Sequence, residues 1–153
     1  MAFLLVSPAL RDGAPIPNTY ARDGQNRSPP LRWSDPPRGT RSFLLIAEDT
    51  SSSDGIFRHW AMYDLNPAAR ELPEGAGDVS AGIGRQGVND FGRECYDGPH
   101  PPAGDGPHHY HFRLAALDIA HLEVPAHVDG RALLDAARAH LIDEAQIVVT
   151  CER

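Results

Sequence analysis

Proline and glycine recur in short clusters along the whole chain and break its apolar residues into short runs. The sequence of 153 residues holds 14 of each, in clusters such as SPP, DPPRG and GPHPPAGDG. Proline ends helices and central strands, and glycine weakens both, so the pattern favours short strands joined by generous loops. We predict one mainly β domain over residues 1–153, folded as an antiparallel β-sandwich.

Charge and hydropathy argue against two classes of partner. The net charge is −7, every basic residue is arginine, and the arginines form no run, which disfavours a surface that tracks nucleic-acid phosphates. No segment approaches the roughly 20 apolar residues of a membrane-spanning helix. The apolar opening MAFLLVSPAL lacks the basic start of a signal peptide and predicts a first strand instead. We therefore expect no nucleic acid and no integral membrane segment.

Cysteine usage indicates a reducing compartment. The chain has two cysteines, Cys95 and Cys151, which are too few for a disulfide scaffold. A cytoplasmic protein is the expectation that follows. The sequence leaves open whether these two cysteines pair with each other.

The periodicity of the apolar residues predicts two strands and a peripheral C-terminal helix. SFLLIAE (42–48) is a continuous apolar run, typical of a strand covered on both faces. AQIVVTC (145–151) predicts the last strand. DGRALLDAARAHLI predicts the helix, with Asp129 as its N-cap. Its apolar face at helical spacing comprises Leu133, Leu134, Ala137 and Leu141.

Two further strands alternate between apolar and polar residues with a period of two. In RHWAMYDL (58–65), the alternation places His59 on one face with Ala61 and Tyr63. In HHYHFRLAAL (108–117), the inward face comprises His108, Tyr110, Phe112 and Leu114. The opposite face of that strand, with His109, His111 and Arg113, is predicted to meet solvent.

An inward-facing histidine and tyrosine point to a small polar pocket. His108 and Tyr110 place two polar tips about 7 Å apart on one wall. A buried imidazole or phenol without a hydrogen bond costs roughly 1 to 3 kcal/mol, so either the fold satisfies the two groups or a ligand does. Gly104, Asp105 and Gly106 in the preceding loop can adopt positive φ, which would let backbone N–H groups form an anion-binding nest. The prolines of the same loop stiffen it before binding.

Asp49 and His59 complete the predicted pocket. Asp49 ends the predicted SFLLIAED strand, and His59 lies at the start of the next predicted strand, RHWAMYDL. A carboxylate beside an imidazole raises the imidazole pKa, so a cationic His59 would be available for a phosphate. Spacing alone does not show that these residues converge with His108 and Tyr110.

A hydrolase is an alternative that uses overlapping residues. Asp49, Ser51, His59 and His108 include the residue types of a nucleophilic triad and a general acid. The chain has no G-x-S-x-G elbow, and a serine in an SSS loop has no obvious support for an attack geometry.

A metal site is a third interpretation. His109 and His111 share a strand face and, with His100 or His121, could bind zinc. Exposed strand histidines are usually only solvated. We therefore expect no physiological metal site and no cofactor.

Several ordered motifs give the chain a family resemblance. The opening, from SPALRDGAPIP to TRSFLLIAED, follows the order SP…DG..IP…DG.N.SPPL.W…P..T.SF, and HW and LPEG (72–75) follow it. The block NDFG…CYDGPHPPAGDGPHHYHFRLAALD then carries the specific string GP.PP.G.G.H.Y.F. With these motifs over nearly its whole length, the chain resembles the phosphatidylethanolamine-binding proteins, most closely their short bacterial branch. The resemblance implies a central antiparallel β-sandwich with peripheral helices and a small anion-binding cavity at one end.

The resemblance also implies a ligand site, residue by residue. Asp49 matches the first aspartate of the family's DPDAP motif, and His59 matches the pocket histidine that precedes an aromatic residue. His108 and Tyr110 match the H.Y string, and a pair of prolines matches the cavity mouth. Together with the two loop glycines, the predicted ligand-binding residues are Asp49, His59, His108, Tyr110, Pro101, Pro102, Gly104 and Gly106.

Two departures from the family pattern bear on the ligand. DTSSS stands in place of DPDAP, so Thr50 replaces the first proline and Ser51 the second acid. The lost carboxylate implies a less negative pocket rim. His100 stands where bacterial relatives often carry cysteine, which adds a contact for an anion or a metal at the rim.

Non-enzymatic binding is the predicted function. Four polar groups, two of them potentially cationic, suit a phosphate, a carboxylate or a phosphorylated head group, whereas they do not suit a lipid tail. Eukaryotic relatives regulate kinases and signalling partners, so the resemblance implies a phosphorylated protein partner, or a kinase or protease, as a second class of ligand. Relatives in the bacterial branch can form homodimers, and an exposed strand edge offers one route to such a dimer.

Overall fold

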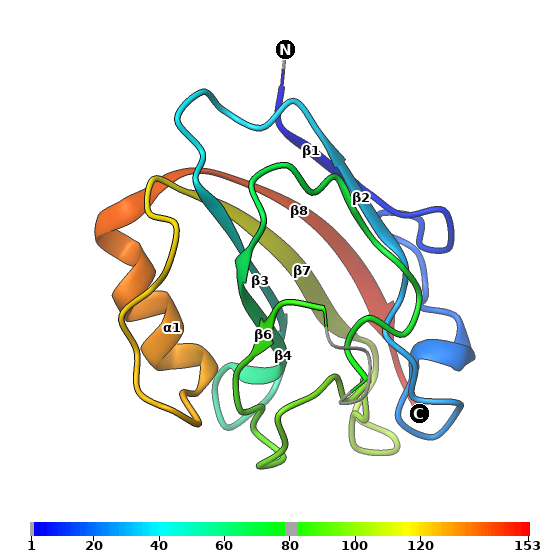
Figure 1. Ribbon diagram of the computed structural model, residues 1–153. Helices are drawn as coiled ribbons and strands as arrows, with labels where there is room; N and C mark the ends of the chain where they lie inside the picture. Colours follow the sequence, from blue (N-terminus) through cyan, green and yellow to red (C-terminus); the bar gives the residue numbers. More distant parts are fainter. Residues whose placement is uncertain (1, 79–82) are drawn as a thin grey trace.

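Two antiparallel sheets pack face to face in the computed structural model, which describes residues 2–78 and 83–153. Figure 1 shows the smaller sheet beside the long, curved strands of the larger one. The smaller sheet has the order β1 (Leu4–Val6), β2 (Leu31–Ser34), β5 (Glu71–Leu72). The larger has the order β6 (Arg85–Gln86), β4 (Phe57–Leu65), β3 (Ser42–Asp49), β7 (His108–Leu117), β8 (Leu141–Cys151). The prediction of a mainly β, antiparallel fold is confirmed.

Strand β3 lies at the centre of the larger sheet and is buried along its whole length. Phe43, Leu45 and Ala47 pack into a sandwich core between the two sheets, together with residues such as Trp33 of β2. Leu44 and Ile46 point the other way, into a second cluster that includes the helix residue Leu133; we call this cluster the helix-side core. The prediction of a strand covered on both faces is thus confirmed.

Helix α1 (Gly130–Ala137) covers the outer face of the larger sheet (Figure 1). Its N-cap is Asp129, whose carboxylate accepts a hydrogen bond from the Ala132 N–H at 2.8 Å, as predicted. A 3-10 turn, η3 (Arg138–His140), follows, and β8 begins at once. A second 3-10 turn, η1 (Asn18–Tyr20), lies near the start of the chain.

The predicted helix face extends too far. Leu141 is the first residue of β8, is 48% exposed and pairs with Leu117 of β7. The last strand therefore begins four residues before the predicted AQIVVTC segment. Pairing along the whole of β7 supplies backbone hydrogen bonds that outweigh the helical spacing of a single leucine.

A β-bulge in β4 changes the face that His59 occupies. Ala47 pairs with Trp60, but the next residue, Glu48, pairs with Arg58, which leaves His59 as an extra residue. The His59 ring lies 5.4 Å from the ring of Tyr110, centroid to centroid, on the sandwich side. The predicted sharing of a face with Ala61 and Tyr63 is wrong, because those two residues belong to the helix-side core. Bulges commonly redirect one side chain in this way.

Among the described residues, no helix is long and apolar enough to cross a membrane.

Candidate functional site

The ends of three neighbouring strands enclose a cavity of about 160 Å³. Asp49 at the end of β3 pairs with Phe57 at the start of β4 and with Tyr110 near the start of β7, because all three strands are antiparallel neighbours. The cavity is lined by Asp49, Ser52, Ser53, Asp54, Phe57, His59, Phe91, His100, Pro101, Pro102, Asp105, His108 and Tyr110. The fold therefore brings Asp49, His59, His108 and Tyr110 together, although the sequence alone could not show that they meet.

His108 donates hydrogen bonds from both ring nitrogens. Nδ1 lies 2.7 Å from Oδ2 of Asp49, and Nε2 lies 2.5 Å from Oδ2 of Asp105. Ionised carboxylates only accept, so this geometry holds the imidazole in its cationic form. Burial lowers the pKa of His108, but the hydrogen bonds to Asp49 and Asp105 outweigh it and raise the pKa overall.

His59 is the neutral histidine of the pair. Its Nδ1 donates to the backbone carbonyl of Asp97 at 3.0 Å, which leaves Nε2 as an acceptor. Burial lowers the pKa of His59 despite the raising effects of Asp97 and Asp49. The prediction that Asp49 makes His59 cationic is wrong, because the Asp49 carboxylate bonds to His108. Phe57 and Phe91 pack around His59, with ring centroids 4.9 and 5.5 Å away.

Tyr110 contributes a buried hydroxyl to the same cavity. Among the described residues, its oxygen makes no hydrogen bond of ordinary length and angle, although the Asp49 carboxylate acts on it as a nearby acceptor. Its ring stacks on His108, with a centroid distance of 6.5 Å, close to the predicted spacing of the two side chains. Burial, followed by the Asp49 carboxylate, raises the pKa of Tyr110, so the group remains a hydrogen-bond donor.

The loop before β7 contributes some of its predicted residues to the cavity lining and not others. Pro101 and Pro102 line the cavity, whereas Gly104 and Gly106 are absent from the described lining. Both glycines have positive φ, of 80° and 79°, as predicted. The predicted nest is not formed by the N–H groups of Gly104 and Asp105, because they donate to the carbonyls of Arg153 and Pro102.

The sequence predicted a backbone role for Asp105 in the nest and missed the role of its carboxylate. Its carboxylate reaches His108 Nε2 from between the two glycines. The signal was a lone acid in a Gly-Asp-Gly turn three residues before a predicted pocket histidine. Asp105 and Asp54 both line the cavity, so two carboxylates remain at the rim beside the DTSSS segment.

Ser51 does not join the pocket. Its hydroxyl accepts a hydrogen bond from the backbone N–H of His109 at 3.0 Å and lies 3.4 Å from Nδ1 of the same residue. The serine is exposed and is absent from the described cavity lining. The Ser51–His59 contact that a hydrolase would need is therefore replaced by a contact with His109.

The histidines of the zinc alternative have separate partners. His111 Nδ1 lies 3.1 Å from Gln146, His100 is 3.2 Å from Asp23, and His121 is 3.5 Å from Asp64. No cluster of three or more potential metal ligands occurs within residues 2–78 and 83–153. His100 does line the cavity, in line with its predicted position at the rim.

Both cysteines are free thiols, Cys95 buried and Cys151 partly buried. The possible disulfide between them is not formed. Burial raises the pKa of each thiol, so neither is an activated nucleophile.

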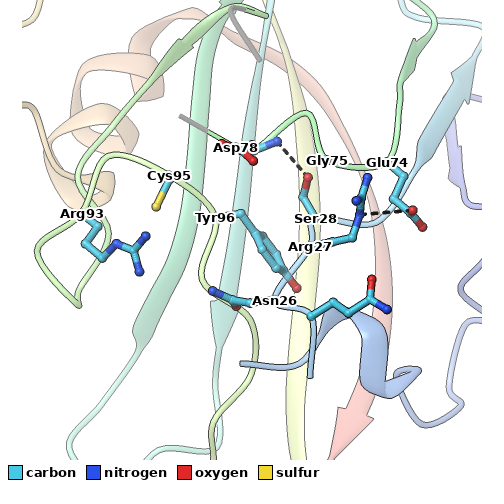
Figure 2. A pocket seen from close by; sticks show the side chains of 11 residues that line it. Asn26, Arg27, Ser28, Glu74, Gly75, Asp78, Arg93, Cys95 and Tyr96 are labelled. Carbon is cyan, nitrogen blue, oxygen red and sulfur yellow. Dashed lines mark hydrogen bonds and ion pairs between the residues drawn. The ribbon is translucent and has the colours of Figure 1, made fainter. Parts of the chain in front are cut away.

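A larger cavity, of about 370 Å³, lies elsewhere on the molecule, and Figure 2 shows its two arginines on opposite sides of Tyr96. Arg27 Nε lies 3.3 Å from Glu74 Oε2, and Arg93 Nη1 donates to Asp97 Oδ1 at 3.0 Å. Both guanidinium groups are already paired with carboxylates. Size alone therefore does not make this cavity the better candidate, whereas the smaller one holds the cationic His108 and the buried Tyr110 hydroxyl.

Comparison with known proteins agrees with the fold and with the motifs that meet at the cavity. The model of the phosphatidylethanolamine-binding protein (PEBP) family matches residues 6–152. The chain belongs to this family. Membership supports a binding-protein fold. The residues that the family motif placed in the pocket are those that the strands bring together here.

Bacterial relatives cover nearly the whole chain. A UPF0098 protein of Aquifex aeolicus is 38% identical over 143 residues, which is 93% of this chain and 84% of the relative. The structure of YbcL from Escherichia coli, described as a new member of the mammalian PEBP family, superposes with a TM-score of 0.94 at 29% identity. CT736 of Chlamydia trachomatis, described as a PEBP homolog, gives 0.87 at 38% identity. Each of these two structures covers 99% of this chain, which covers 98% of each.

Proposed function

We propose that this PEBP-family protein is a non-enzymatic binder of phosphate or of phosphorylated groups, and that the cavity around His108 is its ligand site. The observation that carries the proposal is the buried Tyr110 hydroxyl, which makes no hydrogen bond of ordinary length and angle among the described residues, beside a cationic imidazole. A donor in this state costs free energy until an acceptor arrives. An oxyanion supplies that acceptor and also has charge to meet His108.

The two histidines suit different oxygens of one phosphoryl group. Cationic His108 and the Tyr110 hydroxyl donate to ionised oxygens, whereas neutral His59 accepts at Nε2 and can receive a hydrogen bond from a P–OH group. The cavity volume of about 160 Å³ suits a head group and not an acyl chain. Phosphate, phosphoethanolamine or the phosphorylated side chain of a partner protein, such as a regulated kinase or protease, fits this chemistry.

Calorimetric titration tests the proposal. Phosphate, phosphoethanolamine and sulfate are titrated at pH 6 and pH 8 into the wild type and into His59→Ala, His108→Ala and His109→Ala. Sulfate is included because its charge is constant over this range. We expect weaker sulfate binding at pH 8 than at pH 6, because His108 loses its proton as the pH rises through its raised pKa, and loss of all binding in His108→Ala. His109→Ala removes an exposed histidine of the same strand and should bind like the wild type.

A wild type that binds none of these anions at either pH contradicts the proposal. Binding that survives in His108→Ala contradicts the assignment of the site. Two further predictions are separate from the ligand site. Gel filtration tests whether the protein forms a homodimer, and cell fractionation tests whether it is cytoplasmic.

A further inference from the structure

Two carboxylates flank His108, and they differ in burial. Asp49 sits at the end of β3 with a side chain that is 6% exposed, and it bonds to Nδ1. Asp105 lies in a loop with a side chain that is 49% exposed, and it bonds to Nε2 at 2.5 Å. The first is part of the buried scaffold, whereas the second reaches the imidazole from the solvent side.

Only one of the two N–H groups of His108 is open to exchange. Nδ1–H points to the buried carboxylate of Asp49, whose Oδ1 also accepts a hydrogen bond from the Ser51 N–H at 2.7 Å, so its departure would break two hydrogen bonds. Nε2–H points to a half-exposed carboxylate, whose side chain can rotate into water at little cost in packing. An anion that binds His108 must therefore take the Nε2–H, which is the hydrogen bond that Asp105 now holds.

The loop geometry is consistent with such an exchange. Gly104 and Gly106 flank Asp105 with positive φ, and a Cβ added at either glycine would meet no atom within 4 Å. The turn thus stands clear of the protein body on both sides of Asp105. It is anchored by the Gly104 N–H, which donates to the Arg153 carbonyl at 2.9 Å. The backbone can stay in place while the carboxylate leaves.

We propose that Asp105 is an internal competitor for the anion site, whose carboxylate occupies the ligand's position on His108 and must be displaced when a ligand binds. This inference rests on the proposed function. It makes Asp105 a specificity-determining residue. A monovalent carboxylate gains no more from His108 than Asp105 already supplies, whereas a dianionic phosphoryl group gains a second charge and the Tyr110 hydroxyl as well. The site should accept phosphoryl groups and reject simple carboxylates.

Paired alanine variants test the competition. Asp105→Ala removes the competing carboxylate, and Asp54→Ala removes an exposed acid from the same cavity lining, for which no hydrogen bond to His108 is found. Phosphate and acetate are titrated into both variants and the wild type at about pH 7.5, where inorganic phosphate is mainly a dianion. We expect Asp105→Ala to bind phosphate about tenfold more tightly or better, and to bind acetate where the wild type does not. Asp54→Ala should show a smaller gain, since it relieves repulsion without freeing Nε2.

Nitrogen-15 NMR of the His108 ring, in the same proteins, reports whether Nε2 is protonated and what binds it. In Asp105→Ala, we expect the Nε2–H signal to shift on adding phosphate to the position of a charge-assisted hydrogen bond. Asp105→Asn, which keeps the shape of the side chain, is the second variant, and thermal unfolding checks that each variant folds.

The outcomes separate this inference from the function on which it rests. Equal phosphate affinity in the wild type and Asp105→Ala overturns the competitor role and leaves the anion site standing. Equal gains in Asp105→Ala and Asp54→Ala overturn it too, because general repulsion then suffices. If neither phosphate nor acetate binds any of the proteins, the anion site itself fails and the competitor role falls with it.

Discussion

His108 and His59 lie in one cavity, yet their surroundings drive their protonation in opposite directions. Two carboxylates bond to His108 and raise its pKa. His59 is buried against aromatic rings and bonds to a carbonyl, so its pKa is lowered. The folded state therefore favours His108 protonated and His59 neutral. Stability should fall on both sides of the ordinary histidine pKa, for a different reason on each side.

His108 causes the predicted loss of stability at alkaline pH. Its pKa is higher in the folded than in the unfolded state, so its stabilising effect is complete below the unfolded value of about 6.5 and is lost as the pH rises through the folded value. We expect the free energy of unfolding of the wild type to fall above pH 6.5. His108→Gln should lower it by about 2 kcal/mol at pH 6, since Asp49 loses a charged partner, and should flatten the alkaline decline.

Urea denaturation at pH 6, 7, 8 and 9 measures both effects. The control is His109→Gln, an exposed position on the same strand, where the decline should match the wild type. Parallel profiles for the wild type and His108→Gln would rule out a stabilising imidazolium at this site.

Among the elements, α1 shows how local chemistry and tertiary pairing divide the C-terminal segment. The Asp129 cap sets the start of the helix through its hydrogen bond to the Ala132 N–H. The end of the helical segment is determined by tertiary pairing, because β8 pairs with β7 from Leu141 onward. The cap is readable in the sequence, whereas the end depends on a strand more than twenty residues earlier in the chain.

Removing the cap should have a measurable cost. We expect Asp129→Ala to lower the free energy of unfolding by about 1 kcal/mol, since the Ala132 N–H loses its acceptor. Asp135→Ala is the matched control, because it removes an exposed acid of the same helix whose ion pair with Arg138 lies on the surface. Chemical denaturation compares the two variants, and equal losses would contradict the role of Asp129.

In the whole molecule, the larger sheet separates two apolar clusters, the sandwich core and the helix-side core. Strand β3 contributes to both, with Leu45 on one side and Leu44 on the other. Each of these side chains is at most 1% exposed. The pocket sits where β3 ends, so its carboxylate Asp49 is held by a strand that is fixed on both faces.

Leucine truncations on either side of β3 test this arrangement. Leu44→Ala and Leu45→Ala should each lower the free energy of unfolding by about 3 kcal/mol, because each leaves a cavity in a separate core. Leu4→Ala, at a leucine that is 54% exposed, should change it little. A small effect of Leu44→Ala in urea denaturation would mean that the helix does not cover the sheet.

Much of the architecture was set by local pattern. The period of two in residues 108–117 determines which side chains of β7 face inward, because successive side chains of a strand alternate. The unbroken apolar run of β3 determines burial on both faces, and the Asp129 cap determines the start of α1. Each of these properties depends only on residues close in sequence.

The pairing inside the site was decided by the tertiary structure. A bulge in β4 turns His59 toward Tyr110, and strand register gives Asp49 to His108. Asp105 reaches the same imidazole from a loop. The sequence by itself determined which residue types and which strand ends supply the site. Which carboxylate meets which histidine, and so which histidine carries the charge, depends above all on the 2.7 Å contact between Asp49 and His108. These residues are 59 apart in the sequence, and no local spacing encodes their contact, whereas Asp105 lies only three residues before His108.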